Sequence, residues 1–211
     1  MKFSDIAATV NFILADDGGV TYPASKVYPF IVEAELRIVD RVIGANPVTD
    51  TIMSVSGYLQ KIPGDGIRLL SVDSIGGSGA RLVERSAMDD TDPLWRSAAP
   101  SDTAGEYIFD DRLPKQFQTP PLELGVAIEL SYDRIPDEYD FVAEPDPVIA
   151  LDRTYGPAIA DYAVWRCLSR ADENTPEFGK ATAHYQSFMQ ATGGKAQVNA
   201  MQSPKQRGNQ R

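Results

Sequence analysis

The stretch VAIELSYDRIP, residues 126–136, decides the fold class because its side chains alternate with a period of two. One face carries the apolar side chains Val126, Ile128, Leu130 and Tyr132. The other face carries Ala127, Glu129, Ser131 and Asp133. A half-buried antiparallel strand has this pattern. Weaker runs of the same kind, separated by Gly, Pro and Asp, predict a β region over residues 48–136.

Helical spacing flanks the β region on both sides. Apolar residues that recur every three or four positions predict helices over residues 4–15, 24–43, 149–171 and 176–191. Gly193 and Gly194 are expected to end the last helix. The predicted fold is α+β: a bundle of two N-terminal and two C-terminal helices with an inserted antiparallel β region, all in one domain over residues 1–191.

Composition narrows the class of protein. The chain has 211 residues and a single cysteine, so it forms no internal disulfide and is expected in a reducing compartment such as the cytoplasm. It contains neither an apolar stretch long enough to cross a bilayer nor a signal-peptide pattern, so we expect a soluble protein with no membrane role.

The charge is divided unevenly along the chain. Residues 192–211 carry four bases and no acid, so the formal charge of −10 leaves −14 on residues 1–191. An acidic body repels phosphates, which argues against a DNA-gripping role for the folded part. The segment 192–211 is polar and aperiodic, and we expect a flexible basic tail. Its candidate partner-binding residues are Lys195, Lys205, Arg207 and Arg211.

The run AMDDTDPLWRS, residues 87–97, admits two interpretations. Asp89, Asp90 and Asp92 could supply part of a divalent-metal site and make the protein an enzyme. No EF-hand spacing, phosphate-binding loop or His-x-x-x-His pair completes such a site. We favour a turn in which Asp89 or Asp90 accepts backbone hydrogen bonds, Pro93 sets the exit and Trp95 packs against the sheet. Asp89, Asp92 and Trp95 are then a structural anchor.

Two further pairs of residues are interpreted as structural rather than catalytic. Asp110 and Asp111 lie between short β runs and favour a hairpin turn over a catalytic carboxylate pair. Cys167 and His184 lie on different predicted helices and are interpreted as packing residues, because a catalytic dyad needs the two side chains in contact. The sequence therefore predicts no catalytic, metal-binding or cofactor-binding residue, and a protein that is not an enzyme.

Taken in order, several segments resemble the head-to-tail adaptor proteins of tailed bacteriophages. After two N-terminal helices these are IPGDGIRLLSVDSI, RLVERSAMDDTDPLW, YIFDDRLPKQFQTPP and the long run from Leu151 to Phe188. The resemblance covers most of residues 20–190. Its most specific parts are the Asp-x-x-Asp-Pro-x-Trp run from Asp89 to Trp95, the segment Tyr107–Asp110, and the His-Tyr-Gln sequence at residues 184–186.

The resemblance implies a structural virion protein at the head–tail interface. Such adaptors combine a helical bundle with a β insertion and form a ring, usually of twelve copies, between the portal protein and the tail nozzle or tail tube protein. DNA would pass through the acidic lumen without specific binding, and no cofactor is implied. Two alternatives stay open: a phage-associated hydrolase that uses an aspartate cluster, and an assembly chaperone that leaves before maturation.

Overall fold

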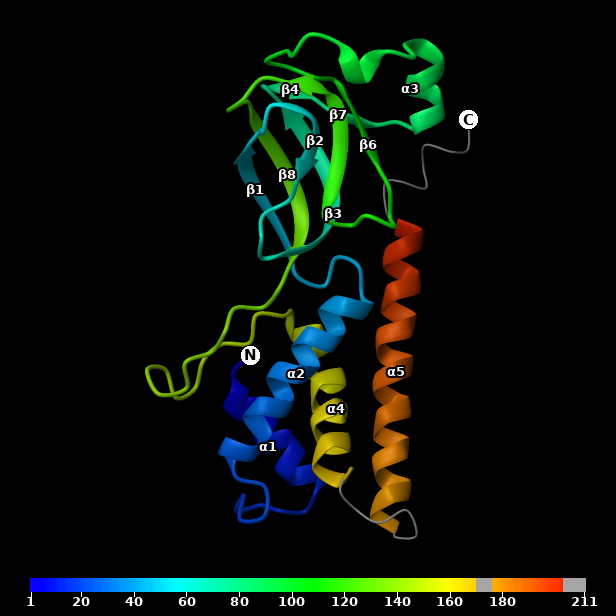
Figure 1. Ribbon diagram of the computed structural model, residues 1–211. Coiled ribbons are helices and arrows are strands. Elements are labelled where there is room, and N and C mark those ends of the chain that lie inside the picture. Colours follow the sequence, from blue (N-terminus) through cyan, green and yellow to red (C-terminus); the bar gives the residue numbers. More distant parts are fainter. Residues whose placement is uncertain (170–175, 203–211) are drawn as a thin grey trace. The chain divides into compact units, whose positions relative to one another are not determined.

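The computed structural model describes residues 1–169 and 176–202, and side chains up to residue 194 (Figure 1). The chain forms two compact units. A helical unit combines Met1–Asn46 with the described residues from Pro136 onward, and a β unit spans Pro47–Ile135. The mixed α+β class predicted from the sequence is confirmed. No described helix is both long enough and apolar enough to cross a membrane.

The helical unit contains α1 (Phe3–Ile13), α2 (Ala24–Arg41), α4 (Gly156–Leu168) and α5 (Pro176–Gln202). The first two lie within two residues of their predicted bounds. Helix α4 starts later than the predicted residue 149, because Pro157 lacks the N–H of an interior residue and is accommodated in the first turn. A short 3-10 turn, Arg153–Tyr155, precedes it.

Helix α5 corrects the predicted end at residue 191, since it continues through Gly193 and Gly194 to Gln202. Glycine costs a helix only about 1 kcal/mol relative to alanine, so good helix formers on either side can carry the helix across it. Thr192 is buried and its hydroxyl donates to the Phe188 carbonyl. Part of the expected flexible tail is therefore helical, Lys195 included. Lys205, Arg207 and Arg211 lie outside the described residues.

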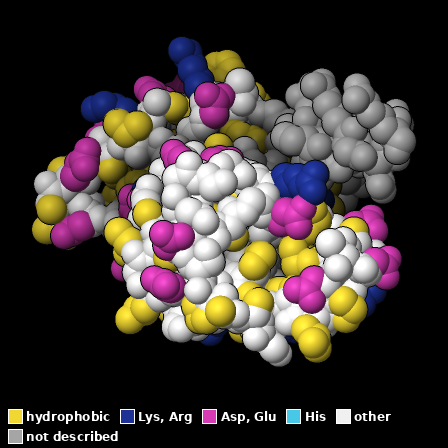
Figure 2. All heavy atoms as spheres, turned by 90° about the horizontal axis from the view of Figure 1, so that it is seen from above, with side chains coloured by type: hydrophobic (Ala, Val, Ile, Leu, Met, Phe, Trp, Pro, Cys, Tyr) yellow, Lys and Arg dark blue, Asp and Glu magenta, His cyan; other side chains and the backbone are white. Residues whose placement is uncertain are grey.

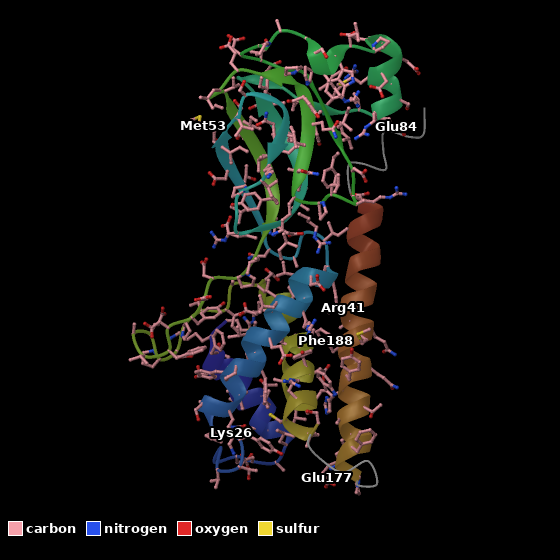
Figure 3. The ribbon with its side chains drawn as sticks, in the orientation of Figure 1. Lys26, Arg41, Met53, Glu84, Glu177 and Phe188 are labelled. Carbon is pink, nitrogen blue, oxygen red and sulfur yellow. The ribbon has the colours of Figure 1, made fainter. Side chains whose placement is uncertain are left out.

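Aromatic contacts show that α4 and α5 run antiparallel. The ring centroids of Tyr162 and Phe188 are 5.0 Å apart, and those of Trp165 and Tyr185 are 4.6 Å apart. Phe188, labelled on α5 in Figure 3, is fully buried. Helix α2 joins the pair through Glu33, whose carboxylate accepts from the Tyr162 hydroxyl at 2.8 Å. The core of the helical unit is thus rich in aromatic rings.

The β unit contains two four-stranded sheets, in the orders β1-β8-β3-β4 and β2-β7-β6-β5. The strands are β1 (Pro47–Met53), β2 (Gly57–Lys61), β3 (Gly66–Ile75), β4 (Ser78–Gly79), β5 (Arg81–Leu82), β6 (Glu106–Phe109), β7 (Gln116–Leu122) and β8 (Ala127–Arg134). All of these pairings are antiparallel except that of β5 with β6. The expectation of a purely antiparallel region is therefore wrong for that pair. The connection between β5 and β6 contains α3 (Arg85–Thr91) and a 3-10 turn, Trp95–Ser97, which return the chain in the same direction.

Strand β8 follows the predicted alternation, with one exception. Ile128, Leu130 and Tyr132 are buried between β1 and β3. Asp133, predicted on the polar face, is also fully buried. Its carboxylate lies 3.5 Å from Nε of Arg68 on the neighbouring strand, and this cation compensates the buried charge.

Candidate functional site

The acidic run forms a compact cluster around a buried indole. Trp95 is 3 % exposed and packs with Met88 and Ile108. One carboxylate oxygen of Asp89 accepts from the Trp95 ring N–H at 2.8 Å and from the Arg96 guanidinium at 3.0 Å. The hydrogen bond from Trp95, together with Arg96, lowers the pKa of Asp89. Asp89 is thus a fixed acceptor for two neighbouring donors.

The other two aspartates of this run have different surroundings. Asp92 accepts from the backbone N–H of Leu94 at 3.0 Å and so caps the turn that follows α3. The predicted capping role of Asp89 or Asp90 is thus taken by Asp92, and the Asp89 carboxylate is turned toward the Trp95 ring instead. The anchor role of Asp89, Asp92 and Trp95 stays a prediction. It is tested below by mutation.

The described side chains do not converge into a metal site at this run. Across residues 1–169 and 176–202, no three His, Cys, Asp or Glu side chains come together closely enough to hold a metal ion. Asp110 and Asp111 lie in the turn between the antiparallel strands β6 and β7, as predicted. Asp110 accepts from the backbone N–H of Arg112 at 3.0 Å, which is typical of a turn aspartate.

Cys167 and His184 lie on the neighbouring helices α4 and α5. His184 Nδ1 lies 2.7 Å from Oδ1 of Asp161, which joins α5 to α4. Cys167 is buried, and burial raises the pKa of its thiol to about 11. A neutral thiol is a poor nucleophile and a poor metal ligand. The hydrogen bond of His184 thus goes to Asp161 on the neighbouring helix rather than to the thiol of Cys167.

A buried carboxylate in the helical unit was not among the predicted site residues. Glu35 on α2 is fully buried, and its Oε1 accepts from the Tyr139 hydroxyl at 3.1 Å and from the Ala150 N–H at 3.0 Å. Burial raises the pKa of Glu35 to about 7. The side chain therefore ties the connection 136–151 to α2, and its burial favours the protonated form.

The helical unit also carries a surface groove between α1 and the start of α4. Its volume is about 660 Å³. The apolar lining includes Ile6, Ile13, Pro157 and Ala160. Three charged residues also line it: Asp5, Arg153 and Asp161. No pattern in the sequence indicated this groove, because its lining comes from two segments far apart in the chain, residues 1–13 and 153–161.

A family model described as SU10 adaptor protein matches residues 1–208. The chain belongs to this family. These are head-to-tail adaptors of bacteriophages, so the resemblance inferred from the sequence is confirmed and extends over both termini. A comparison with curated proteins found no match.

Membership in the SU10 adaptor family indicates a structural role for this chain. The adaptor is a structural component of a phage virion and interacts with other head and tail proteins. Figure 2 shows acidic side chains spread over the face in view, with few basic ones between them. This distribution agrees with the net charge of −10.

Proposed function

We propose that this adaptor forms a closed ring, of twelve copies, between the portal and the tail tube or nozzle of the virion. The family match over residues 1–208 carries the proposal. The helical unit would be the bundle of the adaptor, and the β unit its insertion. DNA would pass through the ring without specific binding, because acids lining the lumen would repel the phosphates.

The C-terminal segment is proposed to bind the portal or an adjacent subunit. Its four cations, Lys195, Lys205, Arg207 and Arg211, contrast with a body of net charge −14. Repetition of weak contacts around a ring raises their combined strength through effective concentration. Removal of residues 203–211 keeps all of α5 and should leave a folded protein that attaches poorly to heads.

A nonsense mutation in the gene tests the proposed function. We expect DNA-filled heads without tails, and recovery of infectivity when purified protein is added. The protein should then remain in the mature particle at the head–tail junction. Particles that acquire tails without it would refute the adaptor role, and its absence from mature particles would favour an assembly chaperone.

The same infectivity assay distinguishes the adaptor role from the hydrolase alternative. The triple change Asp89→Asn, Asp90→Asn and Asp92→Asn removes three negative charges but keeps a side-chain oxygen at each position. Because Asn can still accept from the Trp95 ring, the variant should restore infectivity as the wild type does. A hydrolytic activity that this variant loses would support the enzyme instead.

A further inference from the structure

Helix α5 is anchored to the rest of the helical unit as far as Thr192. Three side chains of this part of the helix are buried, Ala181, Phe188 and Thr192, and their spacings of seven and four place them on one face. Nε of Arg41, at the end of α2, donates to the Thr192 hydroxyl at 3.2 Å (Figure 3). Residues 176–192 thus form a stem that is held in place along its length.

Two adjacent glycines follow the stem directly. Gly193 and Gly194 lie inside the helix, which continues to Gln202. A Cβ added at either glycine would meet no other part of the described chain within 4 Å, apart from the backbone of the helix itself. Neither glycine has a positive φ. Neither space nor backbone geometry therefore requires glycine at these two positions.

The glycine pair makes this point of α5 easy to bend. Alanine favours the helix over glycine by a factor of about five at one position, and so by about 25 at two positions. The Thr192 hydroxyl also donates to the Phe188 carbonyl, and back-bonds of this kind often bend a helix. Sharp bends in helices concentrate at such residues. The helix is thus weakened directly after the residue that Arg41 holds.

The charge of the chain changes at the same point. From Ala181 to Gly194 the sequence contains no Asp, Glu, Lys or Arg. Residues 195–211 contain four bases and no acid. The glycine pair therefore separates an anchored, uncharged part of the helix from the basic segment that follows it.

We infer that Gly193–Gly194 is a hinge at which the basic segment 195–211 leaves the axis of α5 when it binds its partner. The inference rests on the binding proposed above for the C-terminal segment. A rigid helix would aim the segment along the stem and suit only one placement of the partner. A bend at the glycine pair keeps the stem anchored through Thr192 while the cations turn toward an acidic surface of the partner.

Limited trypsin digestion tests the hinge in the isolated protein. The bond after Lys195 lies just beyond the glycines, and its rate of cleavage reports how often the helix opens there. The double variant Gly193→Ala with Gly194→Ala should slow this cleavage about tenfold or more, because alanine closes the helix. Equal rates in the wild type and the double-alanine variant would overturn the hinge.

Gly179→Ala is the matched control for this digestion. Gly179 is an exposed glycine of the same helix, and a Cβ added there also meets nothing within 4 Å. The substitution makes the same chemical change outside the hinge. It should leave the rate of cleavage after Lys195 as it is in the wild type. Slowing of that cleavage by Gly179→Ala to the same degree would overturn a hinge localised at Gly193–Gly194.

Attachment to tail-less heads tests the use of the hinge. At limiting protein concentration, the double-alanine variant should attach about tenfold less well than the wild type, because fewer molecules can bend. Its melting temperature should not fall, and Gly179→Ala should attach normally. Resistance to trypsin with normal attachment overturns the role of the hinge and leaves the adaptor function standing. Normal attachment by a chain that lacks residues 203–211 overturns the proposed binding, and the inference with it.

Asparagine variants separate a hinge from a close approach of the partner to the glycines. Asparagine is larger than alanine but is a weaker helix former. If bending matters, Gly193→Asn with Gly194→Asn should attach better than the double-alanine variant. If the partner instead packs against the bare backbone, the larger side chains should attach worse than alanine, and that order would overturn the hinge.

Discussion

Glu35 should make the helical unit less stable as pH rises from 5 to 8. The carboxyl is fully buried, and burial raises its pKa from an ordinary 4.5 to about 7. The folded protein therefore binds this proton more tightly than the unfolded chain does. Its contribution to stability is complete below the unfolded pKa and is lost as pH rises through the folded pKa.

The magnitude follows from these two values. Integrating the difference in bound protons gives a loss of about 2 to 3 kcal/mol in the free energy of unfolding between pH 5 and pH 8. The variant Glu35→Gln keeps an oxygen that can accept from Tyr139 and from the Ala150 N–H, but it has no charge to bury. Its stability should lack this component, so the difference between wild type and variant should change by about 2 to 3 kcal/mol over this pH range.

Urea denaturation followed by circular dichroism at 222 nm, at four pH values from 5 to 8, measures the effect. Tyr139→Phe adds an internal check, because the Tyr139 hydrogen bond lowers the pKa of Glu35 and its loss should extend the pH dependence upward. A wild-type minus Glu35→Gln difference that stays constant with pH, or that favours the wild type at higher pH, would refute the reasoning.

Three further experiments test the packing of both units. Trp95→Ala should lower the free energy of unfolding by about 3 to 5 kcal/mol in chemical denaturation, because it removes a buried aromatic ring; a loss below about 1 kcal/mol would contradict the anchor interpretation. Gly76 and Gly77 both have positive φ, but only at Gly76 would an added Cβ collide with the Asp102 carbonyl. Gly77→Ala should therefore cost about 1 to 2 kcal/mol and Gly76→Ala clearly more, and equal melting temperatures would refute the collision. Cys167 should react with a thiol reagent far more slowly than free cysteine at pH 8, because burial raises its pKa to about 11, and fast labelling of folded protein would refute this.

Regular, local patterns made most of the secondary structure predictable. The alternation in residues 126–136 gave β8, and the apolar stripe from Val27 to Val42 gave α2, because both patterns report burial on one face. The end of α5 was not predictable, since a Gly-Gly pair ends some helices and interrupts others only slightly. The parallel pairing of β5 with β6 depends on the path of a 23-residue connection, 83–105, which no local pattern records.

Some of the site residues were likewise predictable from local sequence, and others were not. The turn at Asp110 and the burial of Trp95 follow from neighbouring residues and were predicted. Glu35 was missed because it is an ordinary polar position in a helix until the connection 136–151 folds over it. The groove was missed because α1 and α4 are brought together from residues that are about 150 positions apart in the sequence.

Cryo-electron microscopy of the head–tail junction in intact virions tests the central claim most directly. The account predicts a closed ring of twelve copies around the DNA path, with the portal on one side and the tail tube or nozzle on the other. Both the helical unit and the β unit of this chain should fit each repeat of the density. A junction in which the portal contacts the tail directly, or in which this chain is present without ring symmetry, would contradict it.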